Sequence, residues 1–211
     1  MAEASSVNSA AQYATDANLA ARQRLWSSGR QPPFDMFGWV LDLAGLQGGA
    51  GERILDVGCG NGNYEKALAT RGHSGPVVAM DLSLGMLATI SSPTRLRADA
   101  QSLPLRTGCV DVVLAPHMLD HVPDIGRAAT EMRRVLRPGG TCVAVTNGDG
   151  NLREVRHLVE QSIGGGWTMK RFSDVFSLEN GASQLAVAFD NIVKVDCPPG
   201  QVVVTDADGL A

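Results

Sequence analysis

The chain has 211 residues, of which 44 % are hydrophobic and 19 % are charged. This is enough apolar material for one compact domain that buries roughly 70 % of the surface of its unfolded chain. The 24 glycines and 10 prolines are dispersed along the sequence. A disordered, fibrous or low-complexity protein is therefore excluded.

Charge and targeting features narrow the class further. The formal net charge is -4 and the pI is near 5.5, so a phosphate backbone is repelled on average and nucleic acid is disfavoured as a partner. No run approaches the roughly 20 apolar residues of a membrane span, and residues 1–6 lack the basic and apolar regions of a signal peptide. We expect a cytoplasmic protein.

The four cysteines, Cys59, Cys109, Cys142 and Cys197, are far apart and include no C-x-x-C pair. Neither a disulfide framework nor a thiolate zinc site is indicated, and buried free thiols are expected.

The first 50 residues are predicted to form a helical arm or lid. Residues 1–12 are small and polar, a helical pattern runs from Tyr13 to Trp26, and Gln31-Pro32-Pro33 separates it from a second helix at 34–46. Tyr13 is the aromatic side chain of this arm that we favour as a lid contact.

Residues 51–211 are predicted to form the main domain, because short apolar runs alternate with helical patterns in the manner of a parallel α/β sheet. The predicted strands are 53–57, 77–81, 96–99, 110–115 and 141–146. An amphipathic helix with Ile125, Ala128 and Met132 on one face lies before the last of them, and Pro138-Gly139-Gly140 is predicted to end it. Further on we expect helices at 152–163 and 178–189, cap elements within 151–175, and strand material at 192–204.

A glycine-rich turn is the strongest motif. The run Ile54-Leu55-Asp56-Val57-Gly58-Cys59-Gly60-Asn61-Gly62 leads from a strand directly into a helix. Glycines let the backbone turn sharply and let a ligand approach the amide groups, which indicates a nucleotide-type site.

Two further acids end the next two predicted strands. Asp81, 19 residues after Gly62, is placed to accept both hydroxyl groups of an adenosine ribose. Asp99 and the amide of Ala100 are placed to read the edge of adenine.

The spacing of the turn favours a sulfonium nucleoside over a dinucleotide. A dinucleotide fingerprint reads G-x-G-x-x-G, whereas here the third glycine comes one residue early. Asp56 would repel a pyrophosphate but attract the ammonium and sulfonium groups of S-adenosylmethionine. An NAD-dependent oxidoreductase is the alternative that these features oppose.

In its motifs the sequence resembles the class I S-adenosylmethionine-dependent methyltransferases, in particular the branch that acts on small molecules and quinones. The resemblance covers residues 52–146, with the turn above, Val78-Ala79-Met80-Asp81-Leu82-Ser83, Arg97-Ala98-Asp99-Ala100, and Arg134-Val135-Leu136-Arg137-Pro138-Gly139-Gly140. It implies a Rossmann-like, doubly wound, mostly parallel sheet of seven strands. Since no final helix and antiparallel strand follow Val204, we expect a truncated chain whose sheet lacks its last strand.

The resemblance also implies positions for the donor. The methionine end would contact Asp56, Gly58, Cys59, Gly60 and Asn61. Leu82 and Met86 would flank the adenosine, and Ala115, Pro116 and His117 would face the methyl group.

His117 and His121 lie just beyond the fourth predicted strand of the main domain, next to the expected methyl position. A histidine there could deprotonate an acceptor, and His117 is the better candidate; its alternative role is a hydrogen-bonded loop residue that shapes the pocket. The H-x-x-D-H pattern could also bind zinc, but no third ligand is evident, so we expect no metal.

We therefore expect a methyltransferase that transfers a methyl group from S-adenosylmethionine to an O or N atom of a small molecule and releases S-adenosylhomocysteine. An RNA methyltransferase of the same fold, the oxidoreductase, and a non-catalytic S-adenosylmethionine-binding module remain alternatives. Oligomeric state is not predicted.

Overall fold

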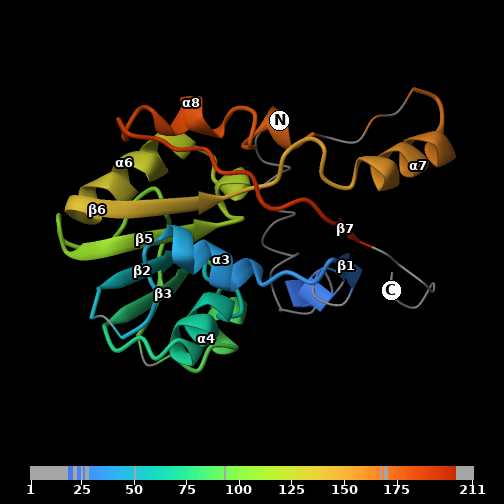
Figure 1. The fold of residues 1–211 in the computed structure, drawn as a ribbon. Coiled ribbons are helices and arrows are strands. Elements are labelled where there is room, and N and C mark those ends of the chain that lie inside the picture. The colour runs from blue at the N-terminus through green and yellow to red at the C-terminus, as the bar shows by residue number, and fades with distance from the viewer. Residues whose placement is uncertain are drawn as a thin grey trace.

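A five-stranded parallel sheet forms the centre of the protein in the computed structural model, which describes residues 19–20, 23–24, 26, 29–49, 51–92, 94–166, 168 and 171–202. Its strands lie in the order β4-β3-β2-β5-β6, and all four neighbouring pairs are parallel (Figure 1). The bounds are β2 Ile54–Val57, β3 Val77–Asp81, β4 Arg95–Arg97, β5 Val110–Pro116 and β6 Leu136–Val145. The predicted doubly wound α/β class is confirmed, with five strands in the main sheet among the described residues.

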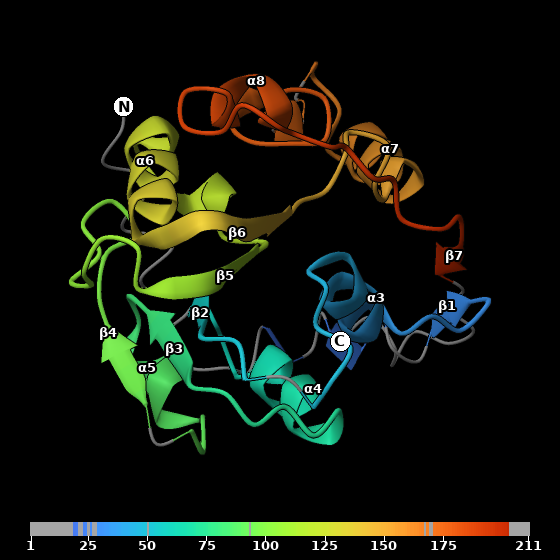
Figure 2. The same ribbon diagram turned by 60° about the vertical axis from the view of Figure 1, so that its left-hand side comes forward.

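Side chains of the two central strands alternate between two hydrophobic cores. Ile54, Val112 and Leu114 pack against the helices α3 and α4, whereas Leu55 and Val113 belong to a second core that includes α6. Figure 2 shows these helices on opposite faces of the sheet. The helices are α3 Met36–Leu43, α4 Asn63–Thr70, α5 Leu84–Ala88, α6 Ile125–Val135, α7 Arg153–Ile163 and α8 Gly181–Leu185, with 3-10 turns η1 Leu119–His121 and η2 Phe172–Asp174.

The amphipathic helix α6 ends earlier than predicted. It stops at Val135, Leu136 is extended, and Pro138–Gly140 lie inside strand β6. Proline cannot continue a helix and drives the preceding backbone into an extended conformation, so the break falls before it. Gly140 passes so close to β5 that a Cβ atom would lie 2.8 Å from the carbonyl oxygen of Asp111.

The C-terminal predictions are partly wrong. Helix 178–189 shortens to α8 with a following turn, and of the strand expected at 192–204 only β7, Gln201–Val202, is a described strand. It pairs antiparallel with β1, Arg30–Gln31, apart from the main sheet. Pro198 and Pro199 lack the N–H group that a ladder requires.

The predicted N-terminal helix lies mostly outside the described residues, of which Leu19, Ala20, Gln23, Arg24 and Trp26 are helical. The second predicted helix is α3, which begins after the capping residue Asp35. None of the described helices is long and apolar enough to cross a membrane.

Phe176 fastens the segment after α7 to the main core. Its side chain is 1 % exposed and packs with the α6 core, while its carbonyl oxygen accepts a hydrogen bond from Thr146 at 3.1 Å. The next helix, α8, approaches so closely that a Cβ atom on Gly181 would lie 3.0 Å from the Phe176 ring.

We predict that Phe176→Ala lowers the free energy of unfolding by about 3 to 5 kcal/mol, because it removes a fully buried aromatic ring and leaves a cavity. Urea denaturation followed by circular dichroism measures this. A loss below about 1 kcal/mol would show that the core closes without the ring.

Candidate active site

The turn from β2 to α4 depends on three glycines with left-handed backbone. Gly58, Gly60 and Gly62 have φ angles of 71°, 54° and 77°, which other residues adopt only at a cost. The amide groups of Gly58 and Cys59 both donate to the carbonyl oxygen of Met80, at 2.8 and 3.0 Å. The turn is thereby tied to the neighbouring strand β3.

The turn lies where ligands bind in open α/β sheets. β2 is flanked by β3 on one side and β5 on the other, so the strand order reverses at its carboxyl end and opens a crevice there. Asp56, Asp81 and Pro116 are all at the ends of these three strands. The residues predicted from separate motifs therefore meet at one edge of the sheet.

Asp56 is a buried acid without a hydrogen-bond donor. Its side chain is fully inaccessible, and no N–H or O–H group of the described residues reaches either carboxyl oxygen. The carboxyl group of Glu65, from the first turn of α4, adjoins it and is in the same condition. Burial raises the pKa of both groups, and the neighbouring Glu65 raises the pKa of Asp56 further.

Asp81 joins its strand to the glycine turn. Its Oδ2 atom accepts a hydrogen bond from the amide of Gly60 at 3.0 Å, and its Oδ1 atom accepts one from the amide of Ser83 at 2.8 Å. Burial raises the pKa of Asp81, while these backbone amide groups oppose the rise. Each oxygen keeps a lone pair for a further donor.

Asp99 follows β4 at the surface. It is exposed and accepts hydrogen bonds from the backbone amide and the side chain of Gln101, at 2.9 to 3.1 Å, whereas Ala100 is buried. The backbone just before Asp99 lies beside the end of β3, because the amide of Ala98 donates to the carbonyl oxygen of Asp81 at 3.3 Å.

The remaining residues that were predicted to contact S-adenosylmethionine differ in exposure to solvent. Leu82 is 63 % exposed, whereas Met86 is 1 % exposed and part of the interior. Asn61 is buried and exchanges side-chain hydrogen bonds with Gln23, the shorter at 2.9 Å. Cys59 and Ala115 are buried, and Tyr13 lies outside the described residues.

His117 stands at the turn that follows β5. It has a left-handed φ of 51°, and its amide donates to the carbonyl oxygen of Val145 on β6 at 2.8 Å. His121 lies at the end of η1, with its Nε2 atom 3.8 Å from Oδ2 of Asp120. Among the described residues, no group of three or more candidate ligands could hold a metal ion.

A cavity of about 900 Å³ begins at His117 and extends along β6. Its walls include Trp39 of α3, Val143 and Val145 of β6, and Phe189 after α8. This volume is in the range of small-molecule sites, and the wall is largely apolar.

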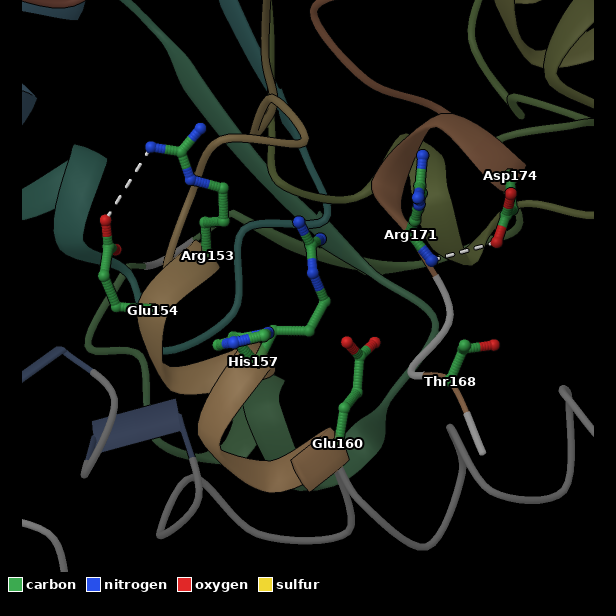
Figure 3. A pocket seen from close by; sticks show the side chains of 8 residues that line it. Arg153, Glu154, His157, Glu160, Thr168, Arg171 and Asp174 are labelled. Atoms are coloured by element: carbon green, nitrogen blue, oxygen red, sulfur yellow. Dashed lines mark hydrogen bonds and ion pairs between the residues drawn. The ribbon is translucent and has the colours of Figure 1, made fainter. Parts of the chain in front are cut away.

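A second cavity, of about 580 Å³, lies between α7 and η2 (Figure 3). Its walls carry arginines and acids in equal number, namely Arg153, Arg156, Arg171, Glu154, Glu160 and Asp174, with His157 and Thr168. Opposite charges face one another, so the cavity has no net positive charge to select an anion.

Two basic residues at the end of α6 and in β6, Arg134 and Arg137, have partners within the fold. Arg134 donates to the carbonyl oxygens of Leu103 and Leu105 at 2.8 and 2.7 Å, and Arg137 pairs with Asp111. These groups are therefore occupied within the fold rather than presented to a nucleic acid.

Sequence reasoning missed three residues at the turn. Glu65 adjoins Asp56, Gln23 binds Asn61, and the side chain of Met118 occupies the space beside Gly58. The position of Glu65 in the first turn of the helix was the available signal, since it places this acid next to the glycines.

The turn suits a ligand with a cationic end. Uncompensated buried carboxyl groups at Asp56 and Glu65 call for a cationic hydrogen-bond donor. Leu19 lies against Gly60, where a Cβ atom would be 2.9 Å from its Cδ2 atom. S-adenosylmethionine has the required charge, so these residues fit it.

Comparison with known proteins agrees with this geometry. Residues 55–144 match a family described as a methyltransferase domain. A malonyl-[acyl-carrier protein] O-methyltransferase from Pectobacterium atrosepticum is 33 % identical over 117 residues, which are 54 % of this chain and 46 % of that protein. An uncharacterized methyltransferase from a Mycobacterium species is 40 % identical over 96 residues, which are 44 % of this chain and 38 % of that protein.

Solved structures share the fold. A SAM dependent methyltransferase from Aquifex aeolicus gives a TM-score of 0.54 at 20 % identity, over 72 % of this chain and 78 % of that one. Phosphoethanolamine N-methyltransferase 2 from Haemonchus contortus gives a TM-score of 0.56 at 21 % identity, over 82 % of this chain and 42 % of that one.

The chain has the fold of the class I methyltransferases, and residues 55–144 match a methyltransferase domain. The motifs that resembled the S-adenosylmethionine-dependent methyltransferases of class I lie within residues 52–146, and the matched methyltransferase domain covers 55–144 of this stretch. The chain spans about half the length of the curated relatives it matches, 46 % and 50 % for two malonyl-[acyl-carrier protein] O-methyltransferases.

We predict that Gly58→Ala disrupts the turn, because its Cβ atom would lie 2.6 Å from the Cβ atom of Met118 at a left-handed φ. Gly49→Ala is the matched control, with a φ of 73° and no described atom within 4 Å of the added Cβ. Strain alone costs about 1 to 2 kcal/mol in both variants.

Thermal unfolding should therefore show a clearly larger loss of stability for Gly58→Ala than for Gly49→Ala. Binding of S-adenosylhomocysteine, measured by calorimetry, should fall only in Gly58→Ala. Equal losses in the two variants would mean that Met118 moves aside freely.

Proposed function

We propose that the protein binds S-adenosylmethionine at the glycine turn and transfers its methyl group to an oxygen or nitrogen atom of a small molecule. The observation that carries the proposal is the meeting of Asp56, Asp81 and the turn at the reversal of strand order. The bound donor would supply an electrophilic methyl group on a sulfonium. The protein's part is to align the acceptor and to exclude water.

Each residue has a role in this proposal. Asp56 attracts the ammonium end of the donor, Asp81 accepts hydrogen bonds from the ribose, and Asp99 with the amide of Ala100 meets the adenine edge. Leu82 covers the adenosine from the exposed side, and Met86 supports that wall from the interior.

The acceptor would occupy the cavity of about 900 Å³ beside His117. This cavity starts at the carboxyl end of β5, which ends at Pro116, and continues along β6. Its apolar walls suit a small molecule with a hydrocarbon or aromatic part. His117 can take a proton from a hydroxyl or amine, which is needed only if the acceptor is protonated.

The relatives suggest a first group of acceptors. Several are named malonyl-[acyl-carrier protein] O-methyltransferases, so a malonyl thioester is the carboxylate acceptor to test first. Phenols, quinols and amines complete a panel that covers O and N acceptors.

Calorimetric titration with S-adenosylhomocysteine, with NAD as the control ligand, tests donor binding on the purified chain. Saturable binding of S-adenosylhomocysteine alone supports the proposal, and production of this compound from S-adenosylmethionine then identifies an acceptor. Binding of NAD, or of neither ligand, contradicts it. Donor binding without turnover on any acceptor would favour a non-catalytic binding module.

We predict that Asp81→Ala weakens binding of S-adenosylhomocysteine at least about tenfold, since charge-assisted hydrogen bonds to a ribose contribute roughly 1.5 to 3 kcal/mol. Asp190→Ala, which changes an exposed aspartate, should leave the affinity unchanged. Calorimetric titration of both variants with S-adenosylhomocysteine tests this prediction. An unaltered affinity of Asp81→Ala would show that Asp81 does not bind the ribose.

We also predict that His117→Gln slows turnover by roughly 10² to 10⁴ while donor affinity stays the same, if the acceptor must lose a proton. Rates of S-adenosylhomocysteine release under saturating donor measure this. A parallel fall in donor affinity and rate would instead assign His117 to the shape of the pocket.

A further inference from the structure

The environment of Asp56 contains more negative charge than one cationic group of a ligand requires. Asp56 and Glu65 present four carboxyl oxygens that no described N–H or O–H donor reaches, and Asp56 is fully buried. Two ionised carboxyl groups in contact in such a place repel each other strongly. A hydrogen bond between them exists only when one of them carries a proton.

We infer that Glu65 is a second carboxyl group that binds S-adenosylmethionine, and that Asp56 and Glu65 share one proton in the ligand-free protein. This proton leaves when the ammonium end of S-adenosylmethionine binds. This inference rests on the proposed function and extends it to a residue that the motifs did not include. An ammonium group offers three N–H donors and one positive charge. It can therefore replace the shared proton, whereas a neutral ligand cannot.

The position of Glu65 supports this role. It lies in the first turn of α4 with its Oε2 atom beside the turn, since a Cβ atom on Gly62 would be 3.3 Å from that oxygen. Burial raises the pKa of Glu65 and of Asp56, as expected for a pair that keeps a proton above the ordinary carboxyl range.

The other titratable groups around the pair do not neutralise it. Asp81, on β3, adds negative charge, although its own oxygens accept backbone hydrogen bonds. The pKa values of Cys59 and Tyr64 are raised by burial and by Asp56, so both stay uncharged. Lys66, also on α4, lowers the pKa of Glu65 through its charge, but its Nζ atom is bound to the carbonyl oxygen of Asn61 at 3.2 Å.

The sign of the pH dependence follows from the exchange. When donor binding expels a proton, affinity rises with pH as long as the ligand-free pair holds that proton, by up to about tenfold per pH unit. Above that range the affinity becomes constant. We predict this slope for S-adenosylhomocysteine between pH 5.5 and 7.5, where an α-amino group remains charged.

The test is calorimetric titration of the full chain with S-adenosylhomocysteine at several pH values, in buffers with different ionisation enthalpies. The wild type should release up to one proton per bound ligand. Glu65→Gln removes the acid that raises the pKa of Asp56 beyond the effect of burial, so this variant should release less proton on binding and show a flatter pH profile. Glu154→Gln, which removes an acid that is 81 % exposed on α7, is the charge control and should behave like the wild type.

A measurement without ligand separates this inference from the proposed function. The folded pair keeps its proton at pH values where the unfolded chain has lost it. Thermal stability should therefore fall as the pH rises above the ordinary carboxyl range, and fall less in Glu65→Gln.

Binding without proton release, or identical profiles of the wild type and Glu65→Gln, would overturn the inference and leave the proposed function intact. Failure of the wild type to bind S-adenosylhomocysteine at any pH would contradict the proposed function and the donor role of Glu65. In that case the stability profiles alone would still confirm or refute the shared proton.

Discussion

The burial of a carboxyl group at the end of the central strand is the constraint on which the rest of this structure depends. Asp56 lies between two hydrophobic cores, where a charge without a partner costs several kcal/mol or is avoided by protonation. Helices cover both faces of the sheet and so bury this group, while pairing with β3 and β5 holds β2 in place despite the cost. Stability and ligand recognition therefore compete at one residue, as they often do at functional sites.

The sequence predicts the centre of the sheet better than its surroundings. Val77–Asp81 and Ile54–Val57 are short apolar runs bounded by glycine or acid, and both strands form where expected. The C-terminal segment was not predictable in the same way, because Ile192, Val193 and Val195 have the side chains of a strand but lie in backbone that pairs with nothing described. Strand propensity alone does not supply a partner.

In the candidate site, too, residues at the ends of strands were predicted and residues of helices and loops were not. Asp81 and Gly60 were predicted from separate motifs, and a hydrogen bond of 3.0 Å joins them, since parallel strands bring their carboxyl ends to one edge. Contacts made by helices and loops were missed, among them Glu65 and Met118. Their positions depend on the path that the chain takes after each glycine, and spacing in the sequence does not encode that path.

The glycine turn also limits how a chain of this design can diversify. Left-handed backbone and close neighbours keep side chains away from Gly58 and Gly60, so only Cys59 and Asn61 carry side chains between the glycines. Cys59 packs with Ala79 and Leu87 under the turn, and Asn61 is bound to Gln23. A mutation at Asn61 would thus remove hydrogen-bond partners of Gln23, a residue 38 positions away, so the turn and the helical arm before it are linked through this one pair of amides.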